Sequence, residues 1–84
     1  MSLPNNMKID ITPHAKERMN KYHITEEMII NCLENPDMVK DSHSTRKIYH
    51  KKLNGYVLRV IVEESKEIKS IITTYKARSG RYGI

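Results

Sequence analysis

The dipeptide Asn54-Gly55 constrains the fold more than any other feature, because no other Asn-Gly pair occurs in the 84 residues. Asn-Gly favours a two-residue type I′ turn, in which both central residues take positive φ. Mixed apolar and basic runs flank the pair on both sides, and each run is long enough to form a strand. The sequence therefore predicts a β-hairpin that turns at Asn54-Gly55.

A two-residue loop also fixes which residues of the hairpin lie opposite each other. Leu53 faces Tyr56 next to the turn, and counting outward places His50 opposite Arg59. Side chains alternate between the two sides of a strand, so the pairs divide into two faces. The first face is mainly apolar and holds Lys47, Tyr49, Lys51, Leu53, Tyr56, Leu58, Val60 and Val62. The second face is mixed and holds Arg46, Ile48, His50, Lys52, Val57, Arg59, Ile61 and Glu63. We expect helices to cover the first face.

Two helices are predicted upstream of the hairpin. Thr12-Pro13 is a good helix start, since Thr is a favoured cap and Pro fits the first helical position. This helix is expected to run from Pro13 to about Tyr22. Thr25 caps the second helix, and Asn35-Pro36 ends it, because the residue before a proline disfavours the helical conformation.

Further strands are expected around these elements. Met7 to Ile11 alternates like a short edge strand, Met38 to Lys40 is a short extended piece, and Glu67 to Tyr75 follows the hairpin. The predicted fold class is α+β, with two N-terminal helices packed on one face of an antiparallel sheet of three to four strands. We expect one domain over residues 1–84, with residues 1–6 flexible.

The chain is basic, with 15 Lys and Arg against 10 Asp and Glu, a net charge of +5 and a pI near 9.4. The excess is concentrated in the segments 46–52 and 76–81. Clustered positive charge favours a polyanionic partner such as nucleic acid, or an acidic protein. A solvated basic surface without a partner is the alternative.

Several classes of protein are disfavoured. The single cysteine, Cys32, excludes an internal disulfide and a cysteine-based zinc site, and its apolar neighbours predict that it is buried. The histidines lack metal-ligand spacing, and no Gly-rich phosphate loop occurs, so we expect neither a metal nor another cofactor. No segment resembles a membrane span or a secretory signal, and we expect a cytoplasmic protein.

Arg59 is the most informative residue, because a charge at the centre of a sheet is costly unless its face is open or a partner is present. It is either held by a salt bridge or snorkels to water, or it forms an anion site whose guanidinium binds phosphate. His50 lies opposite and supplies a titratable group. The residues alone leave both interpretations open.

The chain resembles a small uncharacterised family, a domain of unknown function. The resemblance extends from Lys8 to Tyr82 and rests on the runs His14-Ala15-x-x-Arg18-Met19, Ile24-Thr25-Glu26-Glu27, Asn35-Pro36-Asp37, Leu58-Arg59-Val60 and Ile72-Thr73-Thr74-Tyr75. More distantly, the layout is similar to the RelE and BrnT toxins of bacterial toxin–antitoxin pairs. Those are small basic ribonucleases with two helices on an antiparallel sheet, an arginine on the sheet, and a basic tail with an aromatic residue.

The resemblance to the toxins implies a RelE-like fold and metal-independent cleavage of RNA. It implies RNA as substrate, at the ribosome in some cases, and an antitoxin protein as partner. The catalytic candidates are Arg59, Arg78, Tyr82 and His50. The candidates for binding nucleic acid are Arg18, Arg46, Lys52, Lys76 and Arg81. His50 or Lys52 would serve as the general base.

Two other functions fit the same residues. The first is a nucleic-acid-binding module that holds phosphates without cleaving the chain. The second is a structural or interaction protein that forms a homodimer through an exposed edge strand.

Overall fold

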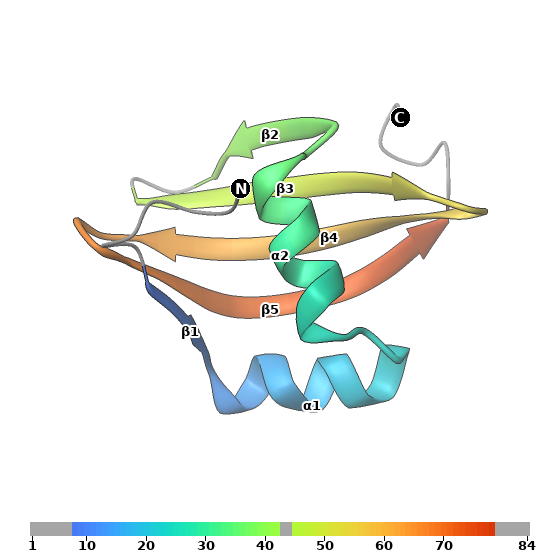
Figure 1. The fold of residues 1–84 in the computed structure, drawn as a ribbon, viewed down its shortest axis with the longest axis horizontal. Coiled ribbons are helices and arrows are strands. Elements are labelled where there is room, and N and C mark those ends of the chain that lie inside the picture. Colours follow the sequence, from blue (N-terminus) through green and yellow to red (C-terminus); the bar gives the residue numbers. More distant parts are fainter. Residues whose placement is uncertain (1–7, 43–44, 79–84) are drawn as a thin grey trace.

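Five strands form a single mixed sheet in the computed structural model, which describes residues 8–42 and 45–78. The elements along the chain are β1 (Lys8–Ile11), α1 (Pro13–Tyr22), α2 (Glu26–Glu34), β2 (Met38–Asp41), β3 (Arg46–Leu53), β4 (Tyr56–Glu64) and β5 (Ile68–Arg78). The strand order is β1-β5-β4-β3-β2 (Figure 1). β1 pairs with β5 in parallel, and all other neighbours are antiparallel.

The hairpin of β3 and β4 has the predicted register, with Leu53 opposite Tyr56 and His50 opposite Arg59. The predicted turn type is wrong. Gly55 has a φ of 84°. The φ of Asn54 is not positive, because His23 is the only described residue other than glycine with a positive φ. A type I′ turn needs positive φ at both central residues, whereas positive φ at the second alone is the pattern of a type II turn. The loop length therefore sets the register without the expected turn type.

Both helices form as predicted and are capped by threonines. Thr12 Oγ1 accepts a hydrogen bond from the Ala15 amide at 3.2 Å, and Thr25 Oγ1 accepts one from the Met28 amide at 3.1 Å. α2 ends at Asn35, whose carbonyl accepts a hydrogen bond from Lys51 Nζ at 2.8 Å. A cation is favourable at this end of a helix, because the last carbonyls carry partial negative charge.

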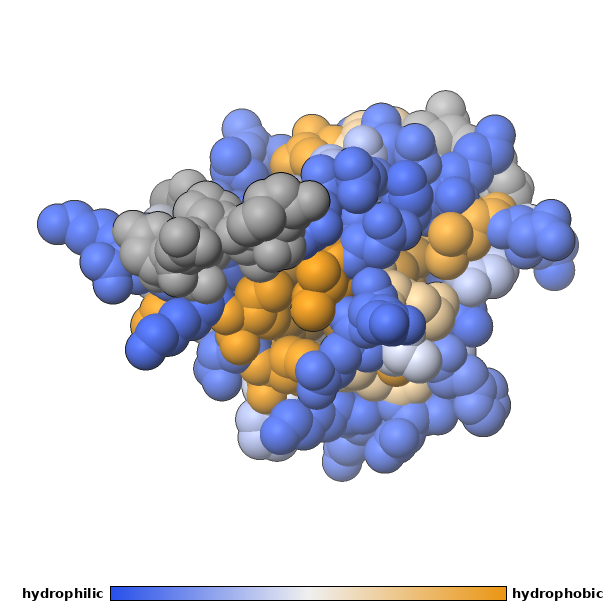
Figure 2. Space-filling model, in the orientation of Figure 1, coloured by the Kyte–Doolittle hydropathy of each residue, from blue (hydrophilic) through white to orange (hydrophobic). Residues whose placement is uncertain are grey.

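The core lies between the helices and one face of the sheet, which we call the helix face. α2 crosses in front of the central strands, and α1 lies along β5 (Figure 1). The buried core residues are Ala15, Ile24, Ile29, Cys32, Leu33, Tyr49, Leu58, Val60, Val62 and Ile71. The hairpin residues in this set belong to the predicted apolar face, so that assignment is confirmed. In the space-filling view of this side, apolar side chains show between α2 and β1, surrounded by hydrophilic ones (Figure 2).

The sheet differs from the predicted one in size and in strand direction. β2 adds to the free side of β3, so the extended piece predicted near Met38 is a strand of the sheet. The predicted edge strand near Ile9 also forms, but it runs parallel to β5. The Lys8 amide donates to the Glu67 carbonyl at 2.7 Å, and the Thr12 amide donates to the Ile71 carbonyl at 3.2 Å. The α+β class with two helices is correct, and the sheet is five-stranded and mixed.

A bulge in β5 anchors the start of α1. Val62 pairs with Ile71 and Ile61 pairs with Thr73, so Ile72 is the extra residue between them. The Thr12 hydroxyl donates to the Ile71 and Ile72 carbonyls, at 2.8 and 3.2 Å. One side chain therefore caps the helix and ties it to β5.

Neither described helix is long and apolar enough to cross a membrane. Cys32 is fully buried in α2, as predicted, and burial raises the pKa of its thiol to about 12. A thiol in this state is a small core side chain and a poor nucleophile.

Replacing Thr12 by alanine should lower the free energy of unfolding by about 1–2 kcal/mol, because the cap and the tie to β5 are both lost. Thr25→Ala is the matched control and should cost less, since the Thr25 cap is local and exposed. Urea denaturation followed by circular dichroism measures both. Thr12→Ser keeps the hydroxyl and should stay close to the wild type. Equal losses in the two alanine variants would contradict the tie to β5.

Candidate functional site

We call the side of the sheet away from the two described helices the open face, and two of its residues, His50 and Val57, are fully buried. Both described helices pack on the helix face, against β3, β4 and β5. The strand registers place on the open face Arg46, Ile48, His50 and Lys52 of β3, Val57, Arg59, Ile61 and Glu63 of β4, and Thr73, Tyr75 and Ala77 of β5. The face therefore combines apolar side chains with basic ones.

Arg59 lies at the centre of this face, between two fully buried residues, Leu58 and Val60. Its Nε donates a hydrogen bond to His50 Nε2 at 3.1 Å, and its Nη1 donates to the Tyr75 hydroxyl. The guanidinium carbon also lies 5.2 Å from the centroid of the Tyr75 ring. We call His50, Arg59 and Tyr75 the Arg59 cluster. Its members are direct cross-strand neighbours on β3, β4 and β5, so the sheet itself fixes their positions.

The backbone beneath Arg59 is also held. Thr74 is fully buried on the helix face, and its hydroxyl donates to the Arg59 carbonyl at 2.8 Å. This contact reinforces the pairing of β4 with β5 at the level of the cluster. Arg59 is thus fixed by its side chain on one face and by its carbonyl on the other.

His50 is neutral in this arrangement. An arginine Nε always carries its hydrogen, so the Nε2 atom that receives it must be the unprotonated nitrogen, and the proton of the neutral ring is on Nδ1. Burial lowers the pKa of His50, and the positive charge of Arg59 lowers it further, with a smaller contribution from Lys40. The neutral ring accepts from Arg59 and leaves the positive charge on the guanidinium.

The cluster presents an oriented cation on the open face. A guanidinium binds two phosphate oxygens in a fork, and the benefit is greatest when the fork does not have to be ordered on binding. The contacts to His50 and Tyr75 order the Arg59 side chain in advance. The site is therefore suited to an anion, and phosphate in particular.

The predicted site residues divide into three groups. Arg46 and Lys52 share the open face with Arg59, where Arg46 Nε contacts Glu63 Oε1 at 3.1 Å and Lys52 is exposed. Lys76 and Arg78 pair with Leu58 and Tyr56, which places them on the opposite side, and Arg18 belongs to α1 on that side too. Arg81 and Tyr82 lie outside the described residues. The structure therefore brings Arg59 and His50 together but does not bring Lys76 or Arg78 to them.

Tyr75 is the residue that sequence reasoning missed. Its signal was the position of Tyr75 at the end of the strand that follows the hairpin, which can pair with β4. Tyr75 can be placed beside Arg59 only when the register between β4 and β5 is known. The turn between these strands has no sequence pattern that fixes this register. In the structure, the Ser65 amide and hydroxyl both donate to the Ile68 carbonyl, at 3.0 and 3.3 Å, and close this turn.

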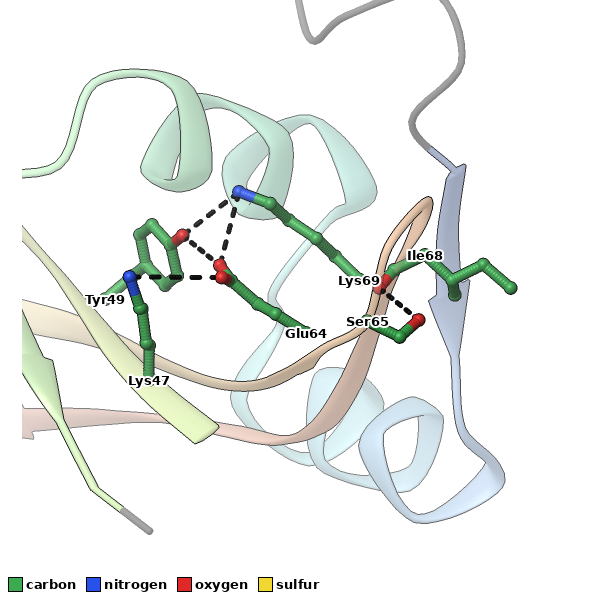
Figure 3. Close-up of polar contacts among 6 residues, drawn as sticks. All are labelled: Lys47, Tyr49, Glu64, Ser65, Ile68 and Lys69. Atoms are coloured by element: carbon green, nitrogen blue, oxygen red, sulfur yellow. Dashed lines mark hydrogen bonds and ion pairs between the residues drawn. The ribbon is translucent and has the colours of Figure 1, made fainter. Parts of the chain in front are cut away.

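A second polar cluster lies at one end of the helix face (Figure 3). The Tyr49 hydroxyl donates to Glu64 Oε2 at 2.5 Å, and Lys69 Nζ contacts both the Tyr49 hydroxyl at 3.0 Å and Glu64 at 3.5 Å. Lys47 Nζ approaches the same carboxylate at 4.0 Å.

Opposite charges compensate each other in this second cluster. Burial acts to raise the pKa of Glu64, but the hydrogen bond from Tyr49 and the lysine charges outweigh it, and the pKa lies below its usual value. Burial and the contact to Glu64 raise the pKa of Tyr49. Glu64 is therefore ionised and Tyr49 is neutral. Each charged side chain of this cluster has an oppositely charged partner within the chain, which is typical of a structural network.

Among residues 8–42 and 45–78, no group of three His, Cys, Asp or Glu side chains is close enough to hold a metal ion.

The fold and the site together define a small α+β domain with a fixed arginine on an open sheet face. The model of a domain of unknown function, DUF4258, matches residues 11–76, and the chain belongs to this family. The expected membership in an uncharacterised family is therefore confirmed, and the matched range contains the whole Arg59 cluster. Searches of curated proteins and of solved structures found no significant match.

Protonation of His50 should destabilise the protein. The folded state holds the pKa of His50 below its ordinary 6.5, so the unfolded chain binds the proton more readily. Stability should therefore fall as the pH is lowered through the ordinary range of histidine, from about pH 7.5 to about pH 5.5. Urea denaturation across this range should show a smaller loss for His50→Gln than for the wild type. His14→Gln, in the exposed part of α1, is the control and should follow the wild type.

Proposed function

We propose that the chain is a metal-independent endoribonuclease of the toxin type, which cleaves RNA by attack of a 2′-hydroxyl on the adjacent phosphate. The observation that carries the proposal is Arg59, a cation held by His50 and Tyr75 at the centre of the open face. A charge with this degree of order, on a sheet face that neither described helix covers, is more useful for binding an anion than for stabilising the fold.

The reaction needs charge stabilisation more than any other contribution. The 2′-oxygen forms a bond to phosphorus and releases its proton to solvent, and the bond from phosphorus to the 5′-oxygen breaks. The 5′-oxygen takes up a proton, which leaves a 2′,3′-cyclic phosphate and a 5′-hydroxyl. Negative charge grows on the phosphoryl oxygens during this exchange, and the Arg59 guanidinium stabilises it.

Tyr75 and His50 have distinct parts in this mechanism. Arg59 donates to the Tyr75 oxygen, so the phenol hydrogen points elsewhere and can bind another oxygen of the same phosphate. His50 is fully buried and its Nε2 receives the Arg59 hydrogen bond, which suits a positioning residue better than a general base. Its role is to orient the guanidinium.

The basic residues around the cluster supply the path for the RNA backbone. Lys52 and Arg46 lie on the open face toward opposite ends of β3. A phosphate near Lys52 meets an exposed cation, while at the other end Arg46 shares its charge with Glu63. Lys40 pairs with Ile48 and adds a cation at the β2 side of the same face. The open face thereby favours a single extended strand of RNA.

The resemblance to the RelE and BrnT toxins also supports the proposal. Those proteins are small and basic, with two helices on one side of a sheet and an arginine on the sheet. In the toxin–antitoxin arrangement, an antitoxin covers the basic surface with an acidic segment, and RNA at the ribosome is the substrate. The mixed five-stranded sheet of this chain is a departure from the antiparallel layout.

Phosphate binding without cleavage is the second candidate function, and the compensated pair of Arg46 with Glu63 favours it. That pair lowers the net charge of the open face, as suits a reversible binding surface. A binding module would hold RNA or DNA in a salt-sensitive manner and leave it intact.

Removing the Arg59 side chain should abolish most of the cleavage. We expect the rate for Arg59→Ala to fall about 100- to 1000-fold, as is usual when a group that stabilises developing charge is lost. The assay incubates purified protein with single-stranded RNA in EDTA and follows the cyclic-phosphate product. Lys21→Ala removes an equal charge from α1 and should cleave like the wild type. Intact RNA that is nonetheless bound by the wild type would support the second candidate function.

Tyr75→Phe should weaken cleavage less than Arg59→Ala, by about tenfold, because the ring stays beside the guanidinium while one hydrogen bond is lost. The same RNA assay measures the loss, and circular dichroism checks that the fold is kept. Tyr22→Phe, in α1, is the matched control. A Tyr75→Phe rate equal to that of the wild type would remove the phenol from the mechanism.

A further inference from the structure

β1 is the outermost strand on one side of the sheet, and no described strand pairs with its outer edge. The hydrogen bonds to β5 show which β1 residues direct their amide and carbonyl groups toward the neighbouring strand. The Lys8 and Thr12 amides donate to β5, so the even-numbered residues direct their backbone groups inward. Ile9 and Ile11 therefore direct their amides and carbonyls outward. An edge of this kind can add another strand.

The charges on β1 are arranged to be self-complementary. Lys8 and Asp10 are exposed and lie on the same face of the strand, two residues apart. In an antiparallel pair of two β1 strands, outward-directed residues must lie opposite each other. The register centred on Ile9 satisfies this and places each Lys8 opposite the Asp10 of the second copy. The next allowed register is centred on Asp10, and it places two carboxylates opposite each other, which is unfavourable.

We propose that the β1 edge binds a second copy of this chain, with β1 of each copy paired antiparallel about Ile9. A two-fold symmetric interface uses the same patch twice, so the patch must carry charges of both signs. The protein as a whole carries a net charge of +5, which opposes association through most of its surface. The β1 strand is locally balanced, with one basic and one acidic side chain on its exposed face.

The surface beside β1 fits the same partner. A pocket of about 380 Å³ lies between β1 and the helices, with Ile9, Ile11, Ile29 and Ile30 as its apolar lining. Two further lining residues, Lys16 and Glu26, carry charges of opposite sign. Ile30 keeps 36% of its surface exposed, and the apolar patch is visible between α2 and β1 in Figure 2. A second copy would cover this patch while the strands pair.

The pairing would join the two sheets into one. The two-fold axis of an antiparallel strand pair is perpendicular to the sheet, so both helix faces lie on one side and both open faces on the other. The two Arg59 clusters would then belong to one continuous surface. Dimerisation can be measured without RNA, so this pairing is tested independently of the proposed ribonuclease function.

The other edge of the sheet lacks this complementarity. The Ser42 amide donates to the Arg46 carbonyl, so Val39 and Asp41 are the outward-directed residues of β2. Self-pairing about Val39 would place Met38 opposite Lys40, and the next register would place Lys40 opposite Lys40. β2 therefore provides the control surface.

Sedimentation equilibrium of the full chain, with single and paired charge reversals, tests the proposal. The wild type should be a dimer, and Asp10→Lys or Lys8→Asp should each weaken dimerisation about tenfold, because both symmetric ion pairs become repulsive. The double variant, Lys8→Asp with Asp10→Lys, should restore the wild-type affinity. Lys40→Asp on β2 should leave it unchanged. A wild type that stays monomeric at its solubility limit, or a dimer that ignores these reversals, would overturn the proposal.

Disulfide crosslinking tests the same register without charge reversal, for the case in which a charge variant folds poorly. Residues 8 and 10 of the two copies would form a non-hydrogen-bonded pair with Cα atoms about 4.5 Å apart, which a disulfide can bridge. Chains with Lys8→Cys and chains with Asp10→Cys should therefore crosslink when mixed and oxidised, and neither should crosslink alone. The native Cys32 is buried and does not take part. No crosslink in the mixture would overturn the register.

Discussion

The hydrogen-bonded register of β3, β4 and β5 places His50, Arg59 and Tyr75 side by side, and the candidate site depends on it. A slip of one residue between β3 and β4 would exchange the two faces of one strand. The same slip would carry Arg59 into the core and Leu58 or Val60 to the outside. Because these two neighbours are fully buried, the packing of the helices on one side holds Arg59 in place on the other.

Much of this arrangement could be predicted from local signals. The Asn54-Gly55 loop length gave the pairing of His50 with Arg59, and the threonine caps gave both helices. The turn type was wrong because the loop length determines the register, while positive φ at Gly55 alone is enough to reverse the chain. The partners of β5 could not be predicted, because its turn has no defining sequence. For this single reason Tyr75 was missed, and Arg78 was named as a catalytic candidate beside Arg59 although it lies on the helix face.

The two polar clusters of the sheet differ in the partners of their charged groups. On the helix face, Glu64 contacts both Lys69 and Lys47, so each charge has an oppositely charged partner within the chain. On the open face, Arg59 has a neutral histidine and a phenol as neighbours, which orient the cation without cancelling its charge. Electrostatic stabilisation of an external anion requires such an oriented cation. This contrast between the two clusters is one reason why we propose the Arg59 cluster as the functional site.

The bulge at Ile72 changes which residues of β5 face the core and which face the other side of the sheet. Ile71 and Tyr75 are four residues apart, and in a regular strand they would point to the same side. The extra residue puts the two halves of the strand out of phase, so Ile71 enters the core while Tyr75 reaches Arg59. The first half of β5 pairs with β1 and anchors α1, whereas the second half places Tyr75 on the open face. A chain with one residue fewer in this strand could keep its core or its Arg59 cluster, but not both.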